Sequence, residues 1–234
     1  MGTLFTEFLY RPLFNLTVFL YNVLPGNDFG LAIIVLTSLI RVLFFPLSIK
    51  TIKSQKAMSK LNPKMKEIKE KHKDNPTAQS AAILQLYKDN KISPLSGCLP
   101  LLIQIPILIA LYQAFMAGFK PENFNLLYGF IENPGAVNGT SLGFINITSK
   151  MPILAVLAGM AQFVQSWQAN NQNQNSGINK EMAALNKQML YFFPIMIIII
   201  GWNLPAGLVL YWITTTVFSI LEQLYIKRKD TDQE

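Results

Sequence analysis

The chain has 234 residues, of which 51% are hydrophobic and only 14% are charged, with a mean hydropathy of +0.30. This composition argues against a soluble globular protein and favours a membrane protein. A single cysteine, Cys98, excludes an internal disulfide, and a single histidine, His72, argues against a metal centre or a histidine relay. The net charge of +7 resides in residues 50–94, which hold eleven lysines against four carboxylates, so no specific nucleic-acid partner is expected.

Residues 1–28 are predicted to form an interfacial helix on the outer face of a membrane. They do not resemble a cleavable signal, because Glu7 precedes Arg11 and Asn15 interrupts the apolar stretch that follows. Residues 29–49 come next and are apolar except for one arginine and a few hydroxyl side chains. A helix of this length crosses about 30 Å of hydrocarbon, so 29–49 is the first predicted span.

Residues 50–94 are predicted to form a lysine-rich helical hairpin on the cytoplasmic side. Leu61, Met65 and Ile68 follow helical spacing, and Asp74-Asn75-Pro76 ends that helix before a second amphipathic stretch begins. Two such helices suit the surface of a membrane, where lysines attract anionic headgroups. We therefore expect anionic lipids as partners of the hairpin.

The remainder of the chain contains three further charge-poor stretches, and the last of them must be divided. No charged residue occurs between Gln188 and Leu221, and a single helix over those positions would measure about 51 Å, too long for a bilayer. Turn chemistry at 203–207 divides it. The predicted order is a second span at 95–119, an outer loop at 120–150, a third span at 151–167, a cytoplasmic loop at 168–189, a fourth span at 190–203, a fifth span at 205–221 and a cytoplasmic tail at 222–234.

The distribution of basic residues predicts the orientation. Sixteen lysines and arginines fall in the cytoplasmic segments, and only Arg11, Lys120 and Lys150 fall outside, as the positive-inside rule requires. The sequence thus predicts an all-α, polytopic membrane protein with five transmembrane helices, a cytoplasmic helical hairpin and an N-terminal interfacial helix. The N-terminus is expected outside and the C-terminus inside.

Arg41 is the charged residue that needs an explanation. A charge inside a span costs about 2.5–3.5 kcal/mol on insertion scales. By helical rise Arg41 lies about 12 Å from the inner end of its span, too deep for its side chain to snorkel to the interface. No Asp or Glu lies inside a predicted span, and Glu222 lies at the inner end of the last one. We therefore expect Arg41 to lack an acidic partner and to attract water, backbone carbonyls or an anionic visitor.

Polar side chains on other spans lie at a depth similar to that of Arg41. Thr37 and Ser38 precede it on the same helix face. Taken alone, each glutamine or threonine is better explained as a hydrogen-bonding contact between helices. Trp212 either serves as an interface anchor or as packing or, equally well, lines a hydrated vestibule. Their shared depth in the cytoplasmic half predicts a hydrated, positively charged groove closed on the outer side. Its predicted members are Arg41, Thr37, Ser38, Gln104, Gln162, Gln165, Trp212, Thr215 and Thr216.

Three runs of sequence carry a family resemblance. They read LIRVLFFPL at 39–47, PLSGCLPLLIQIP at 94–106 and PAGLVLYW at 205–212, with the lysine-rich hairpin between the first two. In this order they resemble the YidC-type membrane protein insertases, a family that includes the mitochondrial and chloroplast oxidase-assembly relatives. The resemblance covers nearly the whole chain.

The resemblance implies a five-helix core without a pore, whose groove faces both lipid and cytoplasm. Arg41 corresponds to the groove arginine, and the hairpin to the segment that captures substrate. The implied groove-lining positions are Gln104, Trp212 and either Gln162 or Gln165. Relatives often carry an asparagine where this chain has Thr214-Thr215-Thr216. The implied clients are nascent membrane proteins, and the candidate partners are the Sec translocon and the ribosome.

These observations predict a membrane protein insertase and chaperone in the bacterial plasma membrane, without metal, cofactor or covalent catalysis. The alternative is a secondary transporter of a small anion with Arg41 as its binding charge, which should show inverted repeats that this chain lacks. An intramembrane enzyme is disfavoured, because the sequence contains neither a two-histidine metal motif nor a Gly-x-Ser-x-Gly elbow.

Overall fold

The computed structural model describes residues 3–93, 99–118, 121–173 and 180–231. Over these residues the protein is all-α apart from one two-stranded antiparallel sheet, in which Thr140 lies opposite Asn146. Its elements are α1 (Thr3–Phe5), η1 (Thr6–Tyr10), α2 (Arg11–Val23), η2 (Pro25–Asn27), α3 (Phe29–Lys60), α4 (Asn62–Lys71), α5 (Pro76–Asp89), α6 (Leu99–Gly118), η4 (Pro121–Leu126), β1 (Thr140–Ser141), β2 (Ile145–Asn146), α7 (Pro152–Asn173), α8 (Lys180–Gly201) and α9 (Ala206–Thr231).

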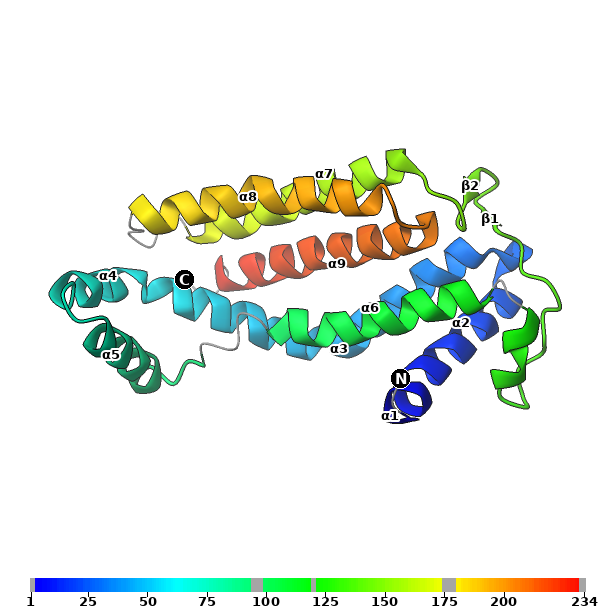
Figure 1. The fold of residues 1–234 in the computed structure, drawn as a ribbon, viewed down its shortest axis with the longest axis horizontal. Coiled ribbons are helices and arrows are strands. Elements are labelled where there is room, and N and C mark those ends of the chain that lie inside the picture. The colour runs from blue at the N-terminus through cyan, green and yellow to red at the C-terminus, as the bar shows by residue number, and fades with distance from the viewer. Residues whose placement is uncertain (1–2, 94–98, 119–120, 174–179, 232–234) are drawn as a thin grey trace.

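The long helices form an elongated bundle (Figure 1). Helices α7 and α8 pack together, α7 also packs on α9, and α9 packs on α3. Helix α2 contacts both α3 and α6. The sheet and the α8–α9 turn lie at one end of the bundle, here called the loop end, and α4 and α5 lie at the opposite end, here called the hairpin end (Figure 1).

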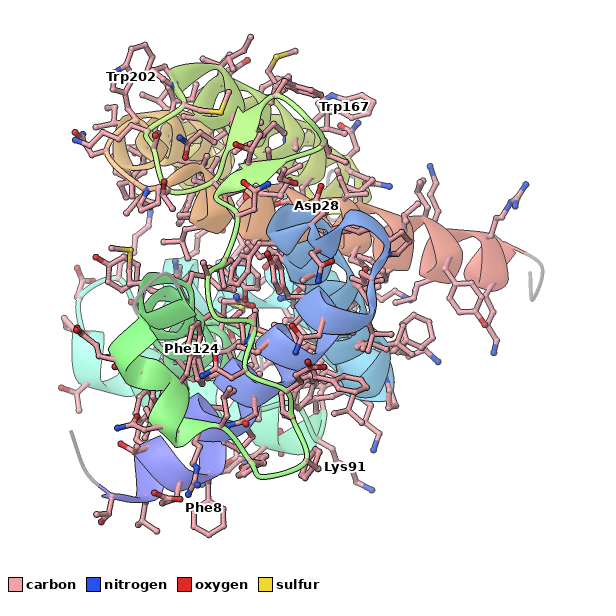
Figure 2. All side chains as sticks on the ribbon, turned by 90° about the vertical axis from the view of Figure 1, so that its right-hand side faces the viewer. Phe8, Asp28, Lys91, Phe124, Trp167 and Trp202 are labelled. Atoms are coloured by element: carbon pink, nitrogen blue, oxygen red, sulfur yellow. The ribbon has the colours of Figure 1, made fainter. Side chains whose placement is uncertain are left out.

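The loop end fixes the first turns of α3 and α9. The Asp28 carboxylate caps α3 by accepting from the Leu31 N–H at 2.9 Å, and it also accepts from the Ser141 hydroxyl and from the Leu142 N–H. In Figure 2 Asp28 lies beside the strands, where α3 begins. At α9, the Gly207 N–H donates to the Ile147 carbonyl at 2.9 Å. Loop carbonyls and one carboxylate thus satisfy N–H groups that a helix start leaves without partners.

The N-terminal segment folds onto the same loop. Phe14 and Val18 of α2 are fully buried and pack against Phe124. Asn15 is buried too: its side-chain amide donates to the Leu126 carbonyl at 3.1 Å, and its carbonyl oxygen accepts from the Tyr128 N–H at 2.6 Å. Helix α2 and the loop after α6 therefore pack together, and their assignment to one side of a membrane stays a prediction.

Helices α4 and α5 form the hairpin end. Asn75 caps α5 by accepting from the Ala78 N–H at 3.0 Å, and Pro76 occupies the first helical position. The Tyr87 hydroxyl donates to Met65 Sδ at 3.2 Å, which joins the two helices. The helix break at residues 72–75 coincides with the Asp74-Asn75-Pro76 signal in the sequence. Contact of the lysines with lipid stays a prediction.

The observed helices run beyond the predicted spans. Helix α3 continues without a break to Lys60 rather than to residue 49, and α9 continues to Thr231 rather than to 221. Most of the predicted loop at 168–189 is helical where the structure describes it, because α7 reaches Asn173 and α8 starts at Lys180. A charge-free stretch shows which residues can lie in the hydrocarbon of a membrane. The helix itself can continue into the charged residues that follow. Residues 95–98 and 119 of the second predicted span lie outside the described residues.

Two helices in the described part of the chain are long and apolar enough to cross a membrane by themselves, Phe29–Lys60 and Ala206–Lys229. The apolar parts of α6 and α8, Gln104–Met116 and Leu190–Gly201, are shorter. The predicted break between the last two spans is present, since a turn at residues 202–205 separates α8 from α9. The count of five spans and their orientation stay predictions.

Candidate functional site

Arg41 has an acidic partner, contrary to the sequence-based expectation. Its Nη1 lies 3.8 Å from Glu222 Oε2 on α9, and only 18% of the arginine side chain and 5% of the glutamate side chain are exposed. The expectation was wrong because depths were measured from the predicted inner ends of two spans whose helices continue past those ends.

The register between α3 and α9 explains the pairing. A Cβ on Gly30 would lie 3.3 Å from Leu210 Cδ2, so these two positions face each other near the loop end. Arg41 follows Gly30 by eleven residues and Glu222 follows Leu210 by twelve. At 1.5 Å per residue both lie about 16–18 Å along their helices, which brings the two charges to the same level.

Three further polar side chains lie on the helices near the pair: Ser48 reaches it directly, whereas Tyr211 and Gln104 lie further toward the loop end. Tyr211 is buried and close enough to Arg41 for the two to interact electrostatically. Gln104 Nε2 on α6 donates a hydrogen bond to the Tyr211 hydroxyl. The Ser48 side chain, two helical turns after Arg41 on α3, reaches the Glu222 carboxylate. Helices α3, α6 and α9 thus each contribute polar side chains to the interior of an otherwise apolar bundle.

The predicted hydroxyl residues bond mainly to their own helices. Thr37 Oγ1 donates to the Ile33 carbonyl at 2.6 Å, Ser38 Oγ to the Ile34 carbonyl at 2.7 Å and Thr216 Oγ1 to the Trp212 carbonyl at 2.9 Å. Thr37 and Thr216 are buried, and Thr215 is buried beside Tyr211. A hydroxyl that bonds four residues back along its helix needs no water to satisfy it.

The glutamines of α7 and Trp212 complete the predicted set. Gln162 Nε2 donates to Ser166 Oγ at 3.3 Å, within its own helix, and Gln165 is half-buried. Trp212 is half-buried and packs against the main hydrophobic core, which favours packing over an interface anchor. Of the predicted site residues, Gln104 is therefore the one that bonds to a side chain, Tyr211, which interacts electrostatically with Arg41.

A cavity of about 280 Å³ lies between α3, α6 and α9 near the loop end. Its lining is almost entirely apolar and includes Phe29, Ile33, Phe115, Ile147, Gly207 and Leu208. It contains none of the predicted groove residues, so it is distinct from the hydrated groove expected around Arg41. Among the described residues no cluster of three histidine, cysteine or acidic side chains could hold a metal ion.

The chain is similar in sequence to known proteins. The profile of a family described as "60Kd inner membrane protein" matches residues 19–233. A membrane protein insertase YidC of Fusobacterium nucleatum is 33% identical over 225 residues, which cover 95% of this chain and 98% of that protein. Proteins of the same description from Geotalea daltonii and Endomicrobium trichonymphae are 33% and 31% identical over 94% and 97% of this chain.

The chain spans nearly all of the Fusobacterium protein but only 37% and 41% of the other two relatives. The part that the family profile matches, residues 19–233, contains all three runs of sequence on which the resemblance rests. These relatives are described as insertases, so the comparison gives no support to the alternative of an anion transporter.

Proposed function

The chain belongs to the family of YidC-type membrane protein insertases, and from this membership we propose that it captures hydrophobic client segments in a hydrated, positively charged groove around Arg41, open to cytoplasm and lipid, and releases them into the bilayer. The family consists of insertases rather than enzymes, and its bacterial members are inner membrane proteins. Insertion therefore requires no covalent step. The work is done by binding, by charge and by the hydrophobic effect.

The observation that carries the proposal is a guanidinium held at mid-helix in α3 with part of its side chain still exposed. A positive charge at such a depth stabilises an acidic or polar group that would otherwise be costly to bring into hydrocarbon. A client terminus that carries a carboxylate pairs with Arg41 part-way into the membrane. Its apolar segment then leaves sideways into lipid, which removes apolar surface from water.

The other predicted groove residues have supporting roles in this proposal. Gln104, through Tyr211, holds one wall of the site, while Gln162, Gln165 and Trp212 on neighbouring helices form the path by which a client enters. Five spans, some of them short, would thin the bilayer locally and lower the barrier for a hydrophilic terminus. In this proposal the N-terminus lies outside and the C-terminus inside.

The hairpin end is proposed as the first point of contact on the cytoplasmic side. Lysines on α4 and α5 face solvent, and one of them, Lys66, forms an exposed ion pair with Glu70 at 4.0 Å. Such a basic surface attracts anionic lipid headgroups by about 1 kcal/mol per lysine. Nascent membrane proteins are the proposed clients, and the Sec translocon and the ribosome are the proposed partners.

The test is insertion of a single-span client with an acidic outer terminus into proteoliposomes that contain the native protein, Arg41→Ala or Arg41→Lys. We expect Ala to lower insertion about tenfold, which corresponds to the loss of about 1.4 kcal/mol of interaction, and Lys to restore most of it. Arg11→Ala at the loop end is the matched control and should insert normally. Equal insertion by all the variants would contradict electrostatic capture.

A further inference from the structure

Glu222 is the one buried acidic side chain among those whose burial the structure describes. A buried carboxylate is stable only when it is paired or hydrogen-bonded. Here the partner is the same guanidinium that the proposed function assigns to the client. Electrostatic capture uses Arg41 alone and gives Glu222 no role, so the position of this carboxylate needs its own explanation.

The contact between Arg41 and Glu222 is loose. At 3.8 Å, Nη1 and Oε2 lie beyond hydrogen-bond distance, so their attraction is Coulombic and lacks a direct N–H···O bond. An arginine that binds a carboxylate well does so through two N–H donors at roughly 2.7–2.9 Å. The guanidinium therefore has donor capacity that Glu222 does not use in this geometry.

The two side chains are also exposed to different degrees. Arg41 keeps 18% of its side chain accessible, whereas Glu222 keeps 5%. A client carboxylate can thus reach the guanidinium without first displacing Glu222. The Ser48 side chain lies beside the Glu222 carboxylate, whose Oε1 is buried without a hydrogen-bond partner.

We propose that Glu222 is a specificity-determining residue: an internal carboxylate that competes with client carboxylates for Arg41 and so sets how acidic a client terminus must be for capture. This inference rests on the proposed function. With Glu222 in place the empty site carries no net charge, and its field on distant anions is weak because opposite charges a few ångströms apart cancel at longer range. A single client carboxylate competes on nearly equal terms with Glu222, while two together prevail.

The experiment compares three single-span clients in proteoliposomes, with no, one or two acidic residues in the translocated terminus. The native protein should insert the two-acid client best. Glu222→Gln keeps the side-chain shape but removes the competing charge, so the one-acid client should gain about tenfold and approach the two-acid client, while the neutral client should not gain. Glu222→Asp retains a carboxylate and should keep the native ranking.

Glu7→Gln is the matched control, because it removes the carboxylate of an exposed Arg11–Glu7 pair at 3.2 Å and changes the net charge equally. It should leave all three clients unchanged. If Glu222→Gln changed insertion of all three clients by the same factor, the residue would have a structural role and the inference would be overturned. Unchanged insertion of all three clients would overturn it as well. In either case the proposed function stands if Arg41→Ala still abolishes the preference for acidic clients. Failure of the native protein to insert any client would overturn both.

Discussion

Two carboxylates that contact α3 are stabilised in different ways. At the loop end, Asp28 accepts hydrogen bonds from the Leu31 and Leu142 N–H groups and from the Ser141 hydroxyl. Further along α3, Glu222 faces a guanidinium at 3.8 Å. The partners of Asp28 are mostly backbone groups fixed by the fold, while the main partner of Glu222 is a long side chain with several rotatable bonds.

The difference separates a structural charge from an exchangeable one. Backbone donors cannot turn away without unfolding the loop, so Asp28 serves to hold residues 140–146 against the start of α3. A guanidinium can exchange one carboxylate for another at little cost in the rest of the fold. The loop end is therefore expected to respond to substitution mainly in stability, and the Arg41 site in both stability and client choice.

The largest expected effect comes from removing one partner of the Arg41–Glu222 pair. Arg41→Leu leaves a buried carboxylate without its counter-charge, and we expect it to lower the free energy of unfolding by about 3–5 kcal/mol. The double variant Arg41→Leu/Glu222→Leu should recover much of that loss, because no charge is left buried. Denaturation in mixed detergent micelles measures both. The same single and double substitutions at the exposed Arg11–Glu7 pair should give an interaction energy of about 0–1 kcal/mol. An equally small interaction energy between Arg41 and Glu222 would contradict a buried pair.

A smaller effect is expected where α3 meets the loop. A Cβ on Gly30 would lie 2.1 Å from Ser141 Oγ and 2.6 Å from Ser141 Cβ, so Gly30→Ala must push the strand away from α3. Overpacking of this kind costs about 1–3 kcal/mol, read as a lower melting temperature in detergent. Gly129→Ala is the matched control, since nothing lies within 4 Å of its added Cβ. Equal melting temperatures for the two variants would show that the loop yields freely.

The smallest effect concerns the charge of Asp28. Burial raises the pKa of this carboxyl, but the hydrogen bonds from Leu142, Ser141 and Leu31 outweigh burial and hold the pKa below its ordinary value. A depressed folded-state pKa contributes stability above the unfolded-state pKa of about 3.9, and this contribution is lost as the pH falls through the folded value. The native melting temperature should therefore drop more steeply between about pH 5 and 3 than that of Asp28→Asn.

The matching substitution at neutral pH is Asp28→Ala, which removes the helix cap and should cost about 1–2 kcal/mol. Asparagine is also a good cap, so Asp28→Asn should cost less at pH 7. Parallel pH profiles for the native protein and Asp28→Asn would show that the charge of Asp28 contributes nothing to the loop end.

Local signals predicted much of this fold. The break at Asp74-Asn75-Pro76 and the turn before Ala206 both occur where proline and turn residues predicted them, because these residues restrict the backbone whatever surrounds them. The site was predicted less completely. Arg41 stands out in the sequence because a charge in an apolar run is conspicuous, whereas Glu222 ends a charge-free run a few residues before the basic tail and looks ordinary.

The sequence by itself determined that the protein is helical, apolar and built like the YidC-type insertases, because composition, periodicity and motif are properties of neighbouring residues. Only the tertiary structure decided that Glu222 faces Arg41 and that α2 packs against the loop after α6. Both depend on the register between helices far apart in the chain. That register is set by close contacts such as Gly30 with Leu210, which no local pattern encodes.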